Sequence, residues 1–119
     1  MKRLALVTGG TRGIGASIAQ KLKEAGYHVV VVYHGNNKAA HGFQSKVEIS
    51  TYKWDVGSFQ DCQEGIAQVT QEHGPIDILV NNAGITRDGV LHKMECVQWT
   101  DVIQTNLTSC FNMCRQVIE

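Results

Sequence analysis

A glycine-rich run at residues 8–15 reads TGGTRGIG and stands between a short apolar run and a segment with helical spacing. In that place a loop can bring a phosphate to the N-terminus of the following helix, where unpaired N–H groups and the helix dipole favour an anion. We expect Gly9 to permit a tight exit from the strand, Gly13 to let the backbone approach a pyrophosphate, and Gly15 to let the helix pack closely on the sheet. The run therefore predicts a dinucleotide-binding loop.

The glycine pattern taken alone is weak, because turns and helix caps also gather glycine. Its placement after an apolar run makes it informative. The phosphate loop of nucleoside triphosphatases is excluded, because that loop ends in Gly-Lys-Ser/Thr and residues 13–16 here read GIGA.

The residues after the second apolar run bear on which dinucleotide is bound. Where NAD-specific folds carry an acidic residue that contacts the adenosine ribose, residues 33–36 read YHGN. No carboxylate there would repel a 2′-phosphate, and Arg12 lies within the glycine loop to pair with it through charge-assisted hydrogen bonds. We therefore predict NADP as the cofactor. The alternative for Arg12 is a solvated surface charge.

Four short apolar runs alternate with longer segments, a pattern typical of strand and helix units around a parallel sheet. The strands that this pattern predicts lie at Leu4–Val7, Val29–Val32, Val47–Trp54 and Ile76–Val80. The second run is β-branched throughout, which favours a strand near the middle of the sheet with helices on both faces. We predict an α/β fold, a Rossmann-type doubly wound parallel sheet of about four strand–helix units, in one domain that spans residues 1–119.

Helical spacing is clear after the glycine loop, at residues 59–73, and from Val102 to Cys114. The polar stretch at residues 35–45 has room for at most a short helix. The chain reaches Glu119 without the Gly, Asn or Pro that commonly ends a helix, so we expect the domain to be truncated there.

Composition excludes several classes of partner. Eleven basic and eleven acidic side chains cancel, which leaves no basic surface for nucleic acid or an anionic membrane. The N-terminal apolar run is too short for a signal peptide or a membrane span, so we expect a cytoplasmic protein. The four cysteines have no Cys-x-x-Cys spacing and no histidine at ligand spacing; we interpret them as buried free thiols and predict no metal site.

Three motifs in this order resemble the short-chain dehydrogenase/reductase family: Thr-Gly-x-x-x-Gly-x-Gly at residues 8–15, Asp-Val at 55–56 and Asn-Asn-Ala-Gly at 81–84. The resemblance covers the whole chain and implies a set of cofactor contacts. Asp55 and Val56 would hold the adenine, and the residues after the fourth strand would line the adenosine ribose. The full expected set is Gly9, Thr11, Arg12, Gly13, Ile14, Gly15, Asp55, Val56, Asn82, Ala83 and Gly84.

Each of these polar residues also has an ordinary structural interpretation. Asp55 could be a turn or helix N-terminal carboxylate, and Asn82 a polar turn residue after a strand. The resemblance implies that Asn106 helps to organise a proton-relay water and so belongs to the catalytic set; the alternative is a side chain bonded to the local backbone.

Within the family, segments 51–56, 83–88, 92–94 and 105–108 are most similar to acetoacetyl-CoA reductases. Such enzymes reduce a 3-oxoacyl-CoA to a 3-hydroxyacyl-CoA with NADPH in polyhydroxybutyrate synthesis. Closely related 3-oxoacyl-[acyl-carrier-protein] reductases act on fatty-acid intermediates, and the motifs do not separate the two. The resemblance implies an acyl-CoA substrate and a homotetramer.

The family's catalytic Ser and Tyr-x-x-x-Lys have no counterpart here. In that pair the tyrosine is the acid toward the substrate oxygen and the lysine lowers the tyrosine pKa. The residues four positions after the three tyrosines are Val31, Asn37 and Val56. In the family these groups lie beyond the fourth strand and its following helix, so we expect a truncated reductase that is inactive alone. The other interpretation is a non-catalytic nucleotide-binding or interaction protein that pairs with a reductase subunit.

Truncation has a structural consequence for the fourth strand. Residues 76–80 would form an edge strand with unpaired backbone groups, which favours aggregation or pairing with a partner. The apolar side chains from Val102 to Val117 would either face such a partner or cover the chain's own sheet.

Overall fold

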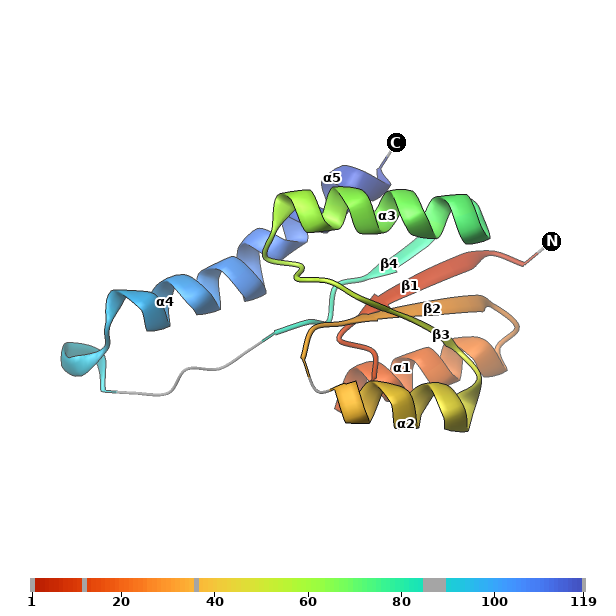
Figure 1. Cartoon of the computed structure of the whole chain (residues 1–119), viewed down its shortest axis with the longest axis horizontal. Coiled ribbons are helices and arrows are strands. Elements are labelled where there is room, and N and C mark those ends of the chain that lie inside the picture. The colour runs from red at the N-terminus through yellow and green to blue at the C-terminus, as the bar shows by residue number, and fades with distance from the viewer. Residues whose placement is uncertain (1, 12, 36, 85–89, 119) are drawn as a thin grey trace.

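The computed structural model describes residues 2–11, 13–35, 37–84 and 90–118, and Figure 1 shows helices on both sides of a central sheet. In chain order the elements are β1 (Leu4–Thr8), α1 (Gly13–Glu24), β2 (His28–Tyr33), α2 (Asn37–Val47), β3 (Ser50–Lys53), α3 (Phe59–His73), β4 (Ile78–Val80), a 3-10 turn (Leu91–Lys93), α4 (Cys96–Ile103), a π-turn (Gln104–Thr108) and α5 (Ser109–Val117).

The four strands form one parallel sheet in the order β3-β2-β1-β4. Leu6 of β1 pairs with Val30 of β2 on one side and with Leu79 of β4 on the other. β1 is buried along its whole length, as is Val29–Val32. The predicted Rossmann-type α/β sheet is confirmed, with β2 in its interior, and β4 lies at one edge of the described sheet as expected.

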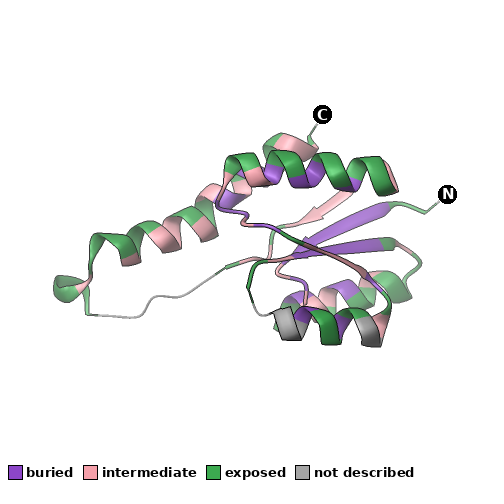
Figure 2. Ribbon diagram, viewed as in Figure 1, coloured by how far each residue is buried: buried purple, intermediate pink, exposed green. Residues whose placement is uncertain are grey.

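Successive side chains of β1 and β2 point to opposite faces of the sheet. Leu6 and Val30 join a cluster with residues of α3 and α5 on one face. Val7 and Val31 join a second cluster with residues of α1 and α2 on the other face. Figure 2 shows the buried strands between the two helical layers. Fully burying each such aliphatic side chain contributes about 1.5–3 kcal/mol, which explains why these runs carry no polar residue.

Two strands are shorter than the apolar runs predicted. β3 begins at Ser50 and not at Val47, because α2 continues to Val47 and Glu48 then turns with φ 57°. Lys23 of α1 stabilises this helix end by donating from Nζ to the carbonyl of Val47 at 2.5 Å. β4 begins at Ile78 and not at residue 76, although the N–H of Asp77 still donates to the carbonyl of Leu4 at 2.9 Å.

The polar stretch after β2 forms a longer helix than expected. α2 has 11 residues, and Ala40 and Phe43 bury an apolar face against the sheet. Two apolar side chains one turn apart were enough to dock a helix that is otherwise polar, since most helical stability in proteins comes from tertiary packing.

The last predicted helix is divided by a π-turn at Gln104–Thr108. α5 lies along α3 and buries Met113 completely, so this part of the face covers the chain's own core. α4 extends away from the sheet, as Figure 1 shows. Its Trp99 is 61 % exposed, and Leu107 and Phe111 beyond it are also exposed. No helix in the described part of the chain is long and apolar enough to cross a membrane.

Candidate functional site

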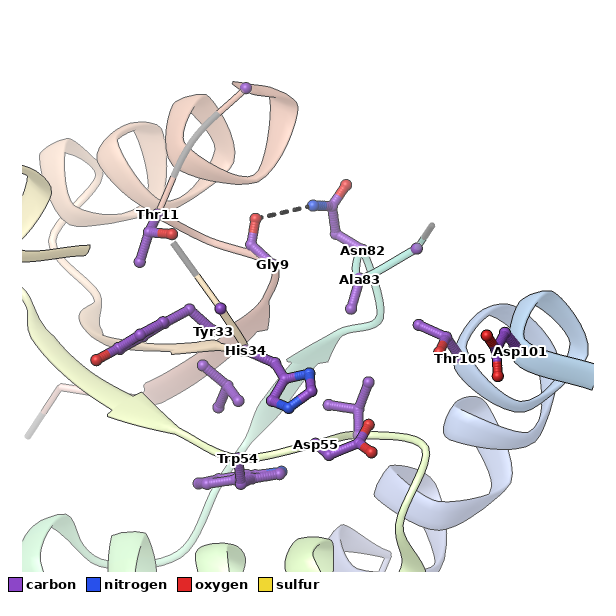
Figure 3. A pocket seen from close by; sticks show the side chains of 15 residues that line it. Gly9, Thr11, Tyr33, His34, Trp54, Asp55, Asn82, Ala83, Asp101 and Thr105 are labelled. Carbon is purple, nitrogen blue, oxygen red and sulfur yellow. Dashed lines mark hydrogen bonds between the residues drawn. The ribbon is translucent and has the colours of Figure 1, made fainter. Parts of the chain in front are cut away.

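A cavity of about 580 Å³ lies at the carboxyl-terminal end of the sheet, where the loops that follow the four strands converge (Figure 3). Ligands of open parallel α/β sheets bind in this crevice because the loops and helix N-termini meet there. The lining residues are Gly9, Thr11, Gly13, Val32, Tyr33, His34, Gly35, Trp54, Asp55, Val56, Asn82, Ala83, Gly84, Asp101 and Thr105.

The glycine loop leaves β1 in a conformation that favours glycine. Gly9 has φ 65°, and its N–H donates to the carbonyl of Val32 at 2.8 Å, which turns the chain across the end of β2. Gly15 does not line the cavity; a Cβ there would lie 2.0 Å from the carbonyl oxygen of Gly9, so only glycine allows α1 to start this close to the loop. The close approach at Gly15 is therefore to the glycine loop and to Asn82, and not to the sheet as predicted.

Of the other predicted residues of the glycine loop, some line the cavity and some do not. Thr11 and Gly13 line the cavity. Ile14 is 75 % exposed and is absent from the lining. Arg12, on which the expected pairing with a 2′-phosphate depends, lies outside the described residues.

Asn82 and Thr8 fasten the loop after β4 to the loop after β1. The Asn82 side-chain amide donates to the carbonyl of Gly9 at 3.2 Å, the contact drawn in Figure 3. The Thr8 hydroxyl, 2 % exposed, accepts from the N–H groups of Asn82 and Ala83, both at 3.0 Å. Ala83 and Gly84 continue the cavity wall from this junction. The role of Thr8 was not predicted, although the residue belongs to the recognised motif.

The loop after β3 supplies Asp55 and Val56, and both line the cavity. One carboxylate oxygen of Asp55, Oδ1, accepts from the N–H of Gly57 at 2.9 Å and closes a local turn. The Val56 side chain is buried, and its carbonyl accepts from the side-chain amide of Asn112 at 3.0 Å. Asp55 is therefore a turn carboxylate, as its structural interpretation expected, and it also faces the cavity; its contact with adenine stays a prediction.

Asn106 lies in the π-turn and is not part of the cavity lining. Its side chain is beside Gly84, where a Cβ would lie 3.3 Å from the Asn106 Oδ1. α4, the π-turn and α5 form one continuous helical segment, Cys96–Val117, which we call the helical arm. Thr105 and Asp101 of this arm face the cavity. A π-turn changes which residues of a helix point to one side, and such turns often occur at functional sites.

Seven lining residues lie outside the predicted set: Val32, Tyr33, His34, Gly35, Trp54, Asp101 and Thr105. The sequence contained a signal that could have identified His34 as a lining residue. It directly follows β2, the position of the ribose-contacting residue in dinucleotide-binding folds. Trp54 ends the third predicted strand. It is 93 % buried, with its ring against Gly65 of α3. Helical spacing gave no indication that Asp101 and Thr105 would line the cavity.

The charges around the cavity are unevenly distributed. Asp55 and Asp101 place two carboxylates on the side formed by β3 and α4, and His34 is the one basic side chain among the described lining residues. Figure 3 shows the His34 ring projecting over the cavity from the end of β2. Glycine backbone, hydroxyl and amide groups share the rest of the wall with the apolar side chains of Val32, Trp54, Val56 and Ala83.

Tyr52 does not act as an acid at this site. It is absent from the lining, its hydroxyl donates to the Glu72 carboxylate, and it lies 2.8 Å from Nε2 of His73. Burial raises the pKa of Tyr52 above its ordinary value, and the neighbouring Glu72 raises it further. In the part of the chain that the structure describes, no group of three His, Cys, Asp or Glu side chains could hold a metal ion.

The sequence model of the short chain dehydrogenase family matches residues 3–119. An acetoacetyl-CoA reductase of Shinella zoogloeoides is 57% identical over 117 residues, which are 98% of this chain and 48% of that protein. A 3-oxoacyl-[acyl-carrier-protein] reductase of Staphylococcus epidermidis is 42% identical over 122 residues, with 98% of this chain and 50% of that protein covered. The chain thus spans about half the length of the curated relatives it matches.

The same relationship appears among solved structures. A mutant of a Serratia marcescens short-chain dehydrogenase/reductase superposes with a TM-score of 0.91 at 28% sequence identity. The superposition covers 98% of this chain and 49% of that one.

Proposed function

The chain belongs to the short-chain dehydrogenase family, and on that premise we propose that it is the NADPH-binding part of an acetoacetyl-CoA reductase. The proposed reaction adds hydride to the 3-oxo carbon of a 3-oxoacyl-CoA and a proton to its oxygen, which yields the 3-hydroxyacyl-CoA and NADP⁺. The observation that carries the nucleotide-binding part is the cavity at the carboxyl ends of the strands, lined by the glycine loop.

The residues of the cavity suit the adenosine and pyrophosphate half of the cofactor. Gly9, Thr11 and Gly13 would surround the pyrophosphate, where backbone N–H groups near the start of α1 favour an anion. The second oxygen of Asp55 would accept from the adenine amino group beside Val56, since Oδ1 is already bonded to Gly57.

The wall after β4 would complete the ribose site. Asn82 is held by Gly9 and presents Ala83 and Gly84 to the cavity. Arg12 is proposed as the partner of the 2′-phosphate. If the Arg12→Ala variant bound NADPH as tightly as the wild type, that role would be excluded. Asn106, one residue beyond the lining residue Thr105, is proposed to hold a proton-relay water in an intact enzyme.

The reduction itself needs an acid that these 119 residues lack. NADPH supplies the hydride when bound, and the carbonyl oxygen then needs a proton donor such as the family's tyrosine. None of Tyr27, Tyr33 and Tyr52 is followed four positions later by lysine. We therefore expect the 119-residue chain to bind NADPH without reducing acetoacetyl-CoA. General acid catalysis typically contributes about 10²- to 10⁴-fold to a rate.

An acyl-carrier-protein thioester is the alternative substrate. The 42% identity to the Staphylococcus epidermidis enzyme favours it less than the 57% identity to the acetoacetyl-CoA reductase favours CoA. A non-catalytic nucleotide-binding protein that pairs with a reductase subunit is the other candidate.

The test is thermal and urea unfolding of the purified chain with NADPH, with NADH and with neither. A ligand at 100 times its Kd stabilises the folded state by about 2.7 kcal/mol. We expect NADPH to stabilise the protein more than NADH does at the same concentration. Asp55→Asn keeps the shape of the turn and removes the charge, so it should weaken the effect of both nucleotides. Unfolding that neither nucleotide shifts would contradict the proposal.

A further inference from the structure

Two side-chain amides reach from the helical arm to the loop after β3. Nε2 of Gln104 donates to the carbonyl of Gly57 at 2.5 Å, and Nδ2 of Asn112 donates to the carbonyl of Val56 at 3.0 Å. Asn112 is 2 % exposed, so its hydrogen bond is shielded from water. If Asn112 moved away from this carbonyl, its buried amide would lose its partner and carry a desolvation penalty. The hydrogen bond therefore favours one relative position of Asn112 and the loop.

The contacts are close as well as polar. A Cβ on Gly57 would lie 3.2 Å from Cγ of Gln104, so the loop and the first residue of the π-turn are in direct packing contact. Val56 is also held by α3, because the Cys62 thiol donates to the Val56 carbonyl at 3.5 Å. The three-residue loop 55–57 is therefore fixed by its own turn, by α3 and by the arm.

The same arm forms one wall of the cavity. Thr105 follows Gln104 directly, and Asp101 lies three residues before it; both line the cavity opposite the end of β2. Figure 3 shows Thr105 and Asp101 on the helix across from the loop that carries Asp55. α4 itself extends away from the sheet, so the two amide contacts near the π-turn locate this wall relative to the loop.

We propose that Gln104 and Asn112 are positioning residues for the adenine end of the bound nucleotide. They hold the Asp55–Gly57 loop and the wall of Asp101 and Thr105 at the separation that an adenine base requires. Their amides bond to the loop backbone, and neither residue lines the cavity. The inference rests on the proposed nucleotide-binding function and adds to it the residues that set the width of the adenine site.

The test compares binding of 5′-AMP and NADP⁺ by wild type and variants, at a temperature well below the unfolding transition of each. Gln104→Met and Asn112→Leu keep approximate size and remove the donor. We expect each to raise the Kd for 5′-AMP about fivefold to tenfold, the effect of about one net hydrogen bond. Gln104→Lys keeps a donor at the end of a flexible side chain and should restore most of the affinity. Gln68→Met, on an exposed site of α3, is the matched control.

The outcomes separate a positioning role from general stabilisation. A raised Kd for Gln104→Met with an unchanged Tm, and rescue by Gln104→Lys, would support the inference. A lowered Tm with a wild-type Kd would overturn it, because the amides would then only stabilise the arm. Wild-type Kd values in both donor-free variants would also overturn it and leave the proposed function intact. No 5′-AMP binding by the wild type would overturn the proposed function and this inference together.

Discussion

The Asn82 side-chain amide donates to the backbone carbonyl of Gly9 at 3.2 Å, across 73 positions of the chain. This bond joins the end of β4 to the glycine loop after β1, and the Thr8 hydroxyl reinforces it by accepting from the N–H of Asn82. The two loops carry the proposed pyrophosphate and ribose contacts. The junction therefore sets the distance between two parts of one ligand.

Removal of the Asn82 amide should cost both stability and affinity. Asn82→Ala leaves the part-buried carbonyl of Gly9 without this donor, a loss of about 1–3 kcal/mol in the free energy of unfolding. Urea unfolding measures the loss, and titration with NADPH should show weaker binding. The neighbouring Asn81→Ala is the control, because Asn81 is exposed and its amide contacts only the thiol of Cys114 at 3.5 Å in the described structure. Equal losses of stability and affinity in Asn82→Ala and Asn81→Ala would contradict the proposed role of Asn82 in joining the two loops.

A methyl group at Gly15 should be far more harmful than one at Gly42. The Cβ of Gly15→Ala would lie 2.0 Å from the Gly9 carbonyl oxygen and 2.5 Å from Nδ2 of Asn82. The backbone must shift, and we expect a loss of about 3 kcal/mol in unfolding free energy. A Cβ at Gly42 of α2 meets nothing within 4 Å, so Gly42→Ala should stabilise the helix by about 0.5–1 kcal/mol. Similar Tm values for the two variants would refute the assigned packing of α1.

His34 should bias the cavity toward the phosphorylated cofactor. It is the one basic side chain among the described lining residues, and it directly follows β2. A carboxylate at that position would repel a 2′-phosphate and accept a bond from a ribose hydroxyl. We expect His34→Asp to shift the ratio of Kd values for NADPH and NADH at least about tenfold toward NADH. His41→Asp, on the exposed side of α2, adds the same charge elsewhere and should leave the ratio unchanged.

The sheet and the glycine loop were predictable because each rests on a local rule. A continuous run such as Val29–Val32 is typical of a strand that a parallel sheet buries on both faces. Gly15 marks a place where a helix meets a loop too closely for a side chain. The contact of Asn82 with Gly9 was not predicted, since the two residues are 73 positions apart in the chain.

Other features depend on tertiary contacts that spacing does not reveal. α2 extends to Val47 because Phe43 packs against the sheet and Lys23 donates a hydrogen bond to the end of the helix. The first residue of the predicted third strand therefore belongs to a helix. The π-turn changes the spacing of side chains around the last helix, and within it Thr105 lines the cavity whereas Asn106 does not. Periodicity of 3.6 residues cannot predict that change.

Stability should decrease as the pH falls through the range in which histidine titrates. Burial lowers the pKa of His28, and the nearby charges of His73 and Lys2 lower it further. The His28 and His73 rings meet edge to face, with centroids 4.8 Å apart. The unfolded chain thus binds a proton more readily than the folded chain, so stability is full above the ordinary histidine pKa and is lost as the pH falls through the lower, folded value.

Urea unfolding from about pH 7.5 to about pH 5 would measure this effect. His28→Gln should flatten the pH dependence, and the effect should be modest because solvent screens a largely exposed side chain. His41→Gln, which changes an exposed histidine of α2, should keep the wild-type slope. Parallel slopes for wild type and His28→Gln would contradict the role of the histidine pair.

The four thiols should react at very different rates. Cys62 is fully buried, and burial raises its pKa to about 11, so at about pH 8 only about one molecule in a thousand carries the reactive thiolate. Cys96 and Cys114 are exposed and Cys110 is half-buried, so the interpretation of all four as buried thiols was wrong for these three. A water-soluble thiol reagent should modify the exposed pair within the native state and Cys62 only when the protein unfolds. Mass spectrometry of digested protein assigns the sites, with a sample in urea as the control for full reactivity.

Cys62 labelling would also report on the nucleotide site, because the same thiol donates to the carbonyl of Val56 in the proposed adenine loop. A ligand that binds only the folded state lowers the population of open molecules by the factor 1 + [L]/Kd. NADPH at 100 times its Kd should therefore slow Cys62 labelling about a hundredfold and leave Cys96 unaffected. Slowing of both thiols to the same degree would point to reagent exclusion and not to binding at this loop. Rapid native labelling of Cys62 would contradict the packing of α3 beneath Val56.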